Sequence, residues 1–264
     1  MQAEANQPPV AAPIQLDIGT ATFEDIKAAL RAGIRDTLAR PALSLFFGLV
    51  YAIFGLCLIA GLVIADQIWI AIAAGVGFPL VAPFLAAGLY EMSRRLKRGV
   101  AFSPGDIFSV IFRQQRREFS IMSFVILFVF WIWAYQVRIV LAINIHHQGY
   151  GSIGDLTTAL FTTAGGLSFL AIGTVIGAVL ATVLYAITVI SMPLLLDKNV
   201  DFVTAMITSV KTVLASPVVM LGWGAVIGGV TLLAVVPGFL GVIFVFPVLG
   251  HTTWHLYERL VSEK

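Results

Sequence analysis

Residues 43–98 read LSLFFGLVYAIFGLCLIAGLVIADQIWIAIAAGVGFPLVAPFLAAGLYEMSRRLKR, two long apolar runs followed by a cluster of cations. A membrane-spanning helix needs about 20 predominantly apolar residues to cross a hydrocarbon core roughly 30 Å thick. Residues 43–64 and 68–92 each satisfy this requirement, and Asp66 and Gln67 provide a short connection between them. The stretch therefore predicts a hairpin of two transmembrane helices.

Four further apolar stretches follow, at residues 119–143, 167–196, 218–236 and 239–257. Pro237 and Gly238 separate the last two, because proline fixes φ and glycine accepts a positive φ. Apolar residues make up 59% of the chain and charged residues 11%, whereas soluble domains are about 25% charged. We therefore expect an all-α polytopic membrane bundle with six transmembrane helices. Residues 22–264 would form a single integral membrane domain, and residues 1–21 a disordered N-terminal tail.

A seventh span is the alternative, because the chain is uncharged from residue 156 to residue 196. A further crossing would carry Lys198, Lys211 and the C-terminal end of the chain to the opposite side of the membrane. Residues 156–166 are rich in threonine and end in two glycines. A short outer helix or a re-entrant segment fits this composition better than a span does.

The cations are distributed unequally between the two sides of this arrangement. With six spans, fifteen of the sixteen Lys and Arg residues fall on one side. The positive-inside rule then places both termini in the cytoplasm, and we expect a protein of the prokaryotic inner membrane. Only Arg138 falls outside the pattern, and its side chain is expected to reach the outer headgroups.

Three amphipathic segments precede the three predicted hairpins and resemble one another. Residues 100–110 and 200–210 share five identities without a gap, and residues 25–41 match residues 201–217 in the same way. Ser103 before Pro104, Thr22 and Asp201 are suited to cap these helices. We therefore expect three units, each made of a cytoplasmic amphipathic helix and a helical hairpin.

Four stretches carry a resemblance to a known family: PALSLFFGLVYAIFGL at 41–56, GLYEMSRRLKRG at 88–99, SMPLLLDKNVDFVTAMITSVKTVLASP at 191–217 and FPVLGHTTWHLYERLV at 246–261. From about residue 24 to residue 261 the chain resembles a family of uncharacterised prokaryotic integral membrane proteins. Some members have names that relate them to cytochrome c oxidase subunit I. The resemblance implies an inner-membrane location but no activity and no catalytic residues. The catalytic oxidase subunit has twelve spans and six imidazole ligands, whereas this chain has six predicted spans and four histidines.

His251 and His255 are the strongest candidates for metal ligands in the sequence. Their spacing of four places both rings on one face of a helix, as in sites where two imidazoles share a metal. Glu91 and Glu258 end similar Leu-Tyr-Glu motifs and complete a low-probability metal set. The competing interpretation is that the pair anchors the last helix at the headgroups. No cofactor is predicted, although metal or haem binding stays open.

The segment after the second span is strongly basic and is expected to contact anionic lipid or a protein partner. Its cations are Arg94, Arg95, Lys97, Arg98, Arg113, Arg116 and Arg117. A net charge of +2 gives no indication of a nucleic-acid partner.

Three functions follow from these patterns. The leading hypothesis is a non-enzymatic accessory or assembly factor of a membrane complex, for instance a respiratory one, because no catalytic constellation is present. The first alternative is a channel or carrier for a small or lipidic solute, with a cavity opened by Pro79, Pro83, Pro193 and Pro247. The second is a metal- or haem-binding protein that uses His251 and His255.

Overall fold

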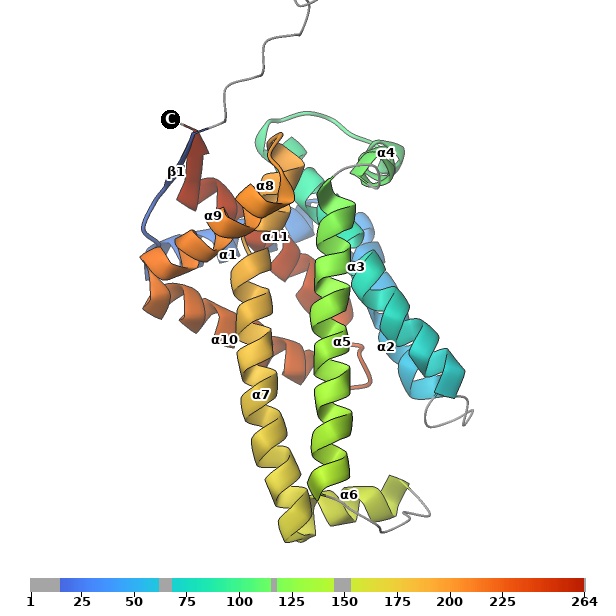
Figure 1. Ribbon diagram of the computed structural model, residues 1–264. Coiled ribbons are helices and arrows are strands. Elements are labelled where there is room, and N and C mark those ends of the chain that lie inside the picture. Colours follow the sequence, from blue (N-terminus) through green and yellow to red (C-terminus); the bar gives the residue numbers. More distant parts are fainter. Residues whose placement is uncertain (1–14, 62–67, 115–117, 145–152, 264) are drawn as a thin grey trace, which may run out of the picture.

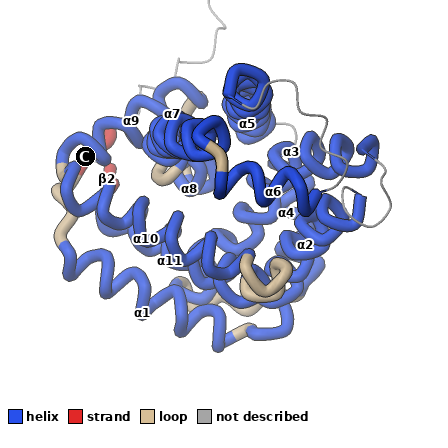
Figure 2. Tube along the Cα trace, turned by 90° about the horizontal axis from the view of Figure 1, so that it is seen from below, coloured by secondary structure: helices blue, strands red, loops and turns tan. Residues whose placement is uncertain are grey.

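The computed structural model describes residues 15–61, 68–114, 118–144 and 153–263, and nearly all of them are helical (Figure 1, Figure 2). The helices are α1 (Phe23–Ala39), α2 (Pro41–Ile59), α3 (Ile68–Lys97), α4 (Pro104–Gln114), α5 (Glu118–Asn144), α6 (Ile153–Thr162), α7 (Ala164–Thr188), α8 (Ser191–Asp197), α9 (Phe202–Ala215), α10 (Pro217–Val235) and α11 (Val242–Leu260). The all-α class is therefore confirmed.

The three amphipathic segments form α1, α4 and α9, and each begins at the predicted cap. The Thr22 hydroxyl accepts from the amide of Asp25, whose carboxylate accepts in return from the amide of Thr22. Ser103 and Asp106 exchange the same two bonds, and the Asp201 carboxylate accepts from the amide of Thr204. Local sequence therefore sets where all three helices start.

Helix α11 lies at the centre of one half of the molecule and packs against α1, α2 and α3. Glycines on its neighbours make this close approach feasible. A Cβ atom on Gly33 would clash with Thr252, and one on Gly48 would clash with the backbone of Ile243. A Cβ atom on Gly250 of α11 itself would lie 2.6 Å from Leu89 of α3. Small residues therefore let these helix backbones meet.

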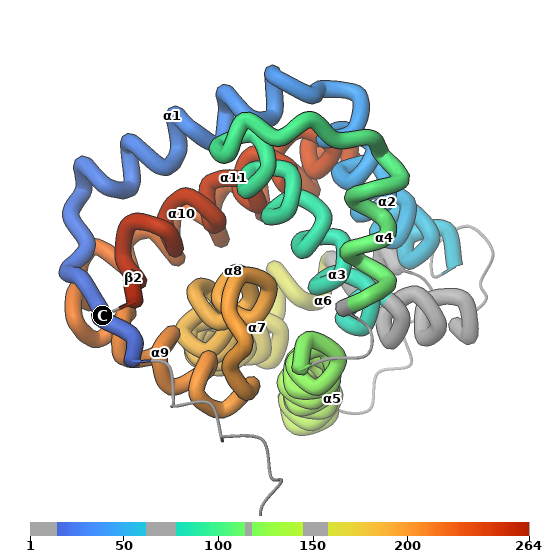
Figure 3. The backbone as a smooth tube through the Cα atoms, turned by 90° about the horizontal axis from the view of Figure 1, so that it is seen from above, coloured from blue at the N-terminus to red at the C-terminus, as the bar shows by residue number. Residues whose placement is uncertain are grey.

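Helices α5 and α7 form a second, more open half. They run side by side from the end of the molecule that carries α8 to the opposite end, where α6 lies across them (Figure 1). Seen from above, both are viewed end on, whereas α1 and α11 run across the view (Figure 3). In their most apolar stretches only 6% of the α5 residues and 0% of the α7 residues are buried. The outer faces of this pair are therefore suited to lipid.

By length and composition, four helical stretches among the described residues can cross a membrane: Pro41–Ile59, Glu118–Asn144, Ala164–Asp197 and Pro217–Val235. The other two predicted spans correspond to α3 and α11. The segment around Asp66 lies outside the described residues. A short outer helix was one of two expectations for residues 156–166, and the ten-residue α6 covers Ile153–Thr162.

Two local features add detail to the predicted spans. The fourth predicted span divides into α7 and α8 at Val189 and Ile190, where the Ser209 hydroxyl accepts from the amide of Ile190 and donates to the carbonyl of Ala186. Helix α3 continues beyond the second predicted span, residues 68–92, to Lys97. Arg94, Arg95 and Lys97 therefore lie on a rigid helix and not in a loop.

Part of the N-terminal tail that was predicted to be disordered, residues 1–21, forms a β-strand. Strand β1 (Leu16–Ile18) pairs antiparallel with β2 (Val261–Glu263). The amide of Gly19 continues the contact by donating to the carbonyl of Leu260 at 2.8 Å. The segment before α1 is therefore fixed to the end of α11, while residues 1–14 lie outside the described residues.

Candidate functional site

His251 lies at the centre of a buried polar cluster between α2, α3 and α11. Its Nε2 atom is 3.2 Å from the Ser44 hydroxyl, and its Nδ1 atom is 2.8 Å from the Ser93 hydroxyl. All three residues are fully buried, with exposed fractions of 0%. Because both ring nitrogens have hydroxyl partners, the imidazole satisfies its hydrogen-bonding capacity within the protein.

His255, one turn later on the same face of α11, contacts α1. Its Nε2 atom is 2.6 Å from Asp36 Oδ2, and its Nδ1 atom is 3.5 Å from Glu258 Oε2. Lys97 Nζ lies 3.1 Å from the same Glu258 oxygen. Helices α1, α3 and α11 are thus joined by one chain of charged groups.

Asp36 connects the two histidine environments. Burial would raise the pKa of its carboxyl group, but hydrogen bonds from His255 and Ser93 outweigh that effect and hold the pKa below its usual range. Ser93 also contacts His251. The cluster of Asp36, Ser44, Ser93, His251 and His255, hereafter the histidine centre, is therefore one connected network.

A serine, histidine and aspartate in one network resemble the components of nucleophilic catalysis. Here, however, Ser44 and His251 are fully enclosed by protein. A nucleophile must reach its substrate, and these atoms are covered on all sides. The geometry instead fits a polar clamp that holds α11 against its neighbours.

The four predicted metal ligands are not gathered at one point. Glu91 is buried between Arg94 and Arg95, with N–O distances of 2.6 Å to each. His255 and Glu258 are neighbours, but His251 contacts serines. Among the described residues, no group of three or more His, Cys, Asp and Glu side chains is arranged to hold a metal ion. Metal content itself stays a matter for measurement.

The headgroup-anchor interpretation of the histidine pair was wrong. His251 and His255 are 0% and 7% exposed, because α1, α2 and α3 enclose this part of α11. The sequence analysis also missed Asp36, Ser44 and Ser93. Gly33, Asp36 and Thr37 form a buried small and polar face on α1, and this pattern is the signal that could have indicated a helix-packing site.

The basic segment that begins in the last turns of α3 is largely paired with carboxylates. Arg94 and Arg95 bind Glu91, Lys97 binds Glu258, and Arg98 lies 3.6 Å from Asp197. Arg113 lies 3.4 Å from the Ser109 hydroxyl, and Arg116 and Arg117 lie outside the described residues. The predicted lipid or partner contact of this segment stays a prediction, but internal ion pairs occupy four of its seven cations.

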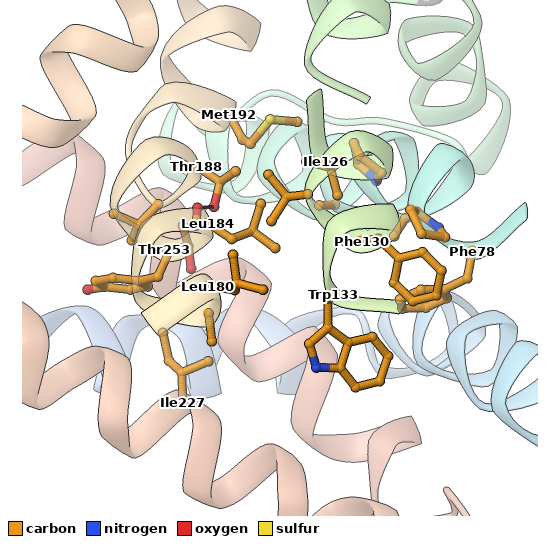
Figure 4. A pocket seen from close by; sticks show the side chains of 18 of the residues that line it. Phe78, Ile126, Phe130, Trp133, Leu180, Leu184, Thr188, Met192, Ile227 and Thr253 are labelled. Atoms are coloured by element: carbon orange, nitrogen blue, oxygen red, sulfur yellow. Dashed lines mark hydrogen bonds between the residues drawn. The ribbon is translucent and has the colours of Figure 1, made fainter. Parts of the chain in front are cut away.

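A cavity of about 560 Å³ lies between α3, α5 and α7, with α10 and α11 behind it. Phe130 and Trp133 of α5 lie on one side and Leu180 and Leu184 of α7 on the other (Figure 4). None of the described residues that line it is charged. The cavity is therefore an apolar chamber.

The proline-containing part of α3 forms one wall of this cavity. Pro79 and Pro83 lie inside the helix and both line the chamber. Proline in a helix removes a backbone hydrogen bond and bends the axis. The Tyr51 hydroxyl donates to the Ala82 carbonyl at 2.7 Å, which ties α2 to this segment. Of the four prolines expected to open a cavity, Pro79 and Pro83 line this one, whereas Pro193 and Pro247 do not.

The hydroxyl groups around the cavity mostly have backbone partners. Tyr185 donates to the carbonyl of Met220 at 2.8 Å, Thr188 to that of Leu184 and Thr253 to that of Leu249. Little polar character is left for an occupant to satisfy. An occupant would therefore be held by shape and apolar contact.

Long helices with exposed apolar faces and a chamber without charge define an integral membrane protein. The comparison with protein families agrees. Residues 70–197, a little under half of the chain, match the family described as "Predicted integral membrane protein (DUF2189)". The family resemblance stated from the sequence is thereby confirmed for this stretch, while the relation of some members to cytochrome c oxidase stays untested. Neither the curated proteins nor the solved structures contain a match to the chain.

Proposed function

We propose that the chain crosses the prokaryotic inner membrane six times, with both termini in the cytoplasm. The cation-bearing end of α3, together with α4, α8 and the β1–β2 pair, gathers at one end of the molecule, and α6 lies at the other (Figure 1). This separation supports the charge asymmetry read from the sequence. In this six-span arrangement, α3 and α11 are the fifth and sixth membrane-spanning helices, in addition to the four stretches named above.

Single cysteines test this topology in a variant that lacks Cys57, the one native cysteine, which is exposed. Cysteines at Gly149 or Gly151 should react with a membrane-impermeant thiol reagent in intact cells, and cysteines at Gly99 or Ser262 should not. Labelling at Ser262 in intact cells would contradict the six-span topology.

We further propose that the protein is non-enzymatic and binds a neutral, chain-like apolar molecule in the cavity between α3, α5 and α7. The observation that carries this proposal is a chamber of about 560 Å³ with no charged group among its described lining residues. Its volume falls within the range of roughly 300–1,000 Å³ typical of ligand sites. A lipid tail or an isoprenoid chain has the matching chemistry.

The absence of charge in the wall also bears on mechanism. Carriers driven by protons or sodium ions use ionisable residues inside the membrane. The described walls here offer aromatic, aliphatic and internally bonded hydroxyl groups. The cavity therefore favours binding, or exchange with the bilayer, over ion-coupled transport.

A substitution on α7 tests the cavity. A Cβ atom on Gly177 would meet only Trp133 Nε1, at 3.7 Å, so a larger side chain there would extend into the chamber. In membranes treated with a diazirine-bearing C16 alcohol, irradiation should label peptides of α3, α5 and α7. Gly177→Leu should reduce this labelling about tenfold, because filling the volume removes the apolar contacts that bind the probe.

Gly173→Leu is the matched control. Gly173 lies one turn earlier on α7, a Cβ atom there would have no atom within 4 Å, and the residue does not line the cavity. It should label like the wild type. Equal labelling of the wild type and both variants would contradict cavity binding.

The accessory role stays a second proposal, because the weakly buried outer faces of α5 and α7 also suit a partner helix. Purification in mild detergent should then recover a stoichiometric membrane partner. A clean preparation of this chain alone would count against that role.

A further inference from the structure

A second cavity of about 560 Å³ lies at the corner between α1 and α2, opposite α4. Its walls are apolar apart from one cation. They comprise Ala39, Arg40, Pro41, Ala42, Leu43 and Phe46 on one side and Phe102, Pro104 and Phe108 on the other. We refer to it as the corner groove.

Aromatic rings form the body of the corner groove. Phe46 and Phe108 meet edge to face with ring centroids 5.8 Å apart, and Phe46 is 42% exposed. An exposed phenylalanine beside a hollow offers contact area to an apolar chain. Helix α4, which lines the groove, lies at the same end of the molecule as the C-terminal end of α3 (Figure 1).

Arg40 is the cation of the corner groove. Its guanidinium carbon lies 5.0 Å from the centre of the Phe102 ring, a cation–π contact that holds the side chain over the groove. In the described part of the chain, Arg40 takes part in none of the ion pairs, unlike Arg94 and Arg95. Its charge is therefore available to an external anion.

The start of α2 adds to this positive character. Arg40 is the N-cap residue and its side chain makes no capping hydrogen bond, and the first turn of a helix carries the positive end of the helix dipole. The equivalent corner between α9 and α10 has the same backbone shape at Ser216, with φ −145° and ψ 64° against −138° and 62° at Arg40. There, however, the Ser216 hydroxyl accepts from the amide of Ala21 at 2.9 Å. The α1–α2 corner has the unused cation that the other corner lacks.

We propose that the corner groove binds an anionic phospholipid of the bilayer. The phosphate lies against Arg40 and the amino-terminal end of α2, and an acyl chain lies along Phe46 and Phe108. One free cation beside a long apolar hollow is complementary to an amphiphile with one negative charge. The sequence predicted the anionic-lipid contact at the basic segment, whose cations are largely paired within the protein. The proposed site lies instead at Arg40, which takes part in none of the ion pairs of the described residues.

Lipid retention on the purified full-length protein provides the test. Native mass spectrometry after incubation with phosphatidylglycerol or phosphatidylcholine should show preferential retention of phosphatidylglycerol. Arg40→Gln should weaken that retention about fivefold, the usual effect of one cation facing an anionic lipid. Phe46→Ala should weaken retention of phosphatidylglycerol as well, because the acyl chain loses its contact.

Arg31→Gln is the matched control, because Arg31 is also exposed and lies on α1 outside the groove. It should bind phosphatidylglycerol like the wild type, and all variants should unfold at similar temperatures. Equal retention of both lipids by the wild type, or unchanged retention by Arg40→Gln, would overturn the proposal. So would full competition by inorganic phosphate, or a co-purifying protein that only Arg40→Gln loses.

Discussion

The two halves of this molecule are built on opposite principles. Around α11, helices approach through glycine and enclose the five polar residues of the histidine centre. Around α5 and α7, the helices present apolar outer faces with few buried residues and line an open apolar cavity. One half is closed by internal polar contacts, and the other contains an open cavity lined by uncharged residues.

This difference follows from the physics of helix association in lipid. Apolar side chains gain little by leaving lipid for each other, so close packing and hydrogen bonds hold transmembrane helices together. The α11 half has both, whereas the α5–α7 half has few interhelical polar contacts among the described residues, such as that of Tyr185. We therefore expect stability to depend on the first half and ligand binding on the second.

Loss of the Asp36 carboxylate should cause the largest decrease in the free energy of unfolding. Asp36→Ala leaves His255 and Ser93 without their partner, and removal of one member of a buried charged pair costs about 3–5 kcal/mol. Equilibrium unfolding of the protein in mild detergent measures the change. Glu263→Ala is the control, because its ion pair with Lys198 is half exposed and should contribute less than about 1 kcal/mol. Equal effects would contradict the role of the histidine centre.

Removal of the Ser93 hydroxyl should have a smaller effect. Ser93→Ala leaves His251 Nδ1 and Asp36 with one partner fewer, at a cost of about 1–3 kcal/mol. Thr182→Ala removes a hydroxyl from an exposed position on α7 and should change stability by about 0.5 kcal/mol or less. If both substitutions have the same effect, the contrast between the halves does not hold.

Acid should weaken the α11 half selectively. Hydrogen bonds from His255 and Ser93 to Asp36, and from His255 and Lys97 to Glu258, outweigh burial and hold both pKa values below their ordinary 3.8 and 4.5. A depressed pKa means that the stabilisation is complete above the ordinary pKa and is lost as the pH falls through the folded value. The stability difference between the wild type and Asp36→Asn should therefore shrink below about pH 4. A constant difference down to pH 3 would contradict an ionised Asp36.

Removal of the Tyr185 hydroxyl should have the smallest effect on the free energy of unfolding among the four predictions. This hydroxyl ties α7 to the carbonyl of Met220 in α10, while the ring would lie 3.2 Å from a Cβ atom placed on Gly224. Tyr185→Phe should cost about 0.5–1.5 kcal/mol and leave the ring packing intact. Unfolding and photolabelling of the same variant separate the two roles. A loss as large as that of Asp36→Ala would show that the α5–α7 half also depends on a polar clamp.

Sequence reasoning succeeded where a few neighbouring residues decide the structure. The caps at Thr22, Ser103 and Asp201 are local, and each predicted helix begins where expected. Long apolar runs likewise predicted the long helices, because length and composition alone determine them.

Sequence reasoning failed where distant residues meet. Asp36 and His255 are 219 positions apart, so spacing along the chain cannot reveal their contact. The division of α7 from α8 depends on Ser209 of another helix, and the internal pairing of Arg94 and Arg95 depends on α3 continuing past Glu91. Prolines alone could not locate the cavity, because Pro79 and Pro83 line it but Pro193 and Pro247 do not.

A structure of the purified protein in lipid nanodiscs, determined by electron cryomicroscopy, tests the central claim most directly. The account predicts an elongated density between α3, α5 and α7, in contact with Phe130 and Leu184, that disappears in Gly177→Leu and persists in Gly173→Leu. Around His251 only protein density is expected. An α5–α7 pair that closes on itself and leaves no chamber, or the same density in Gly177→Leu, would contradict the account.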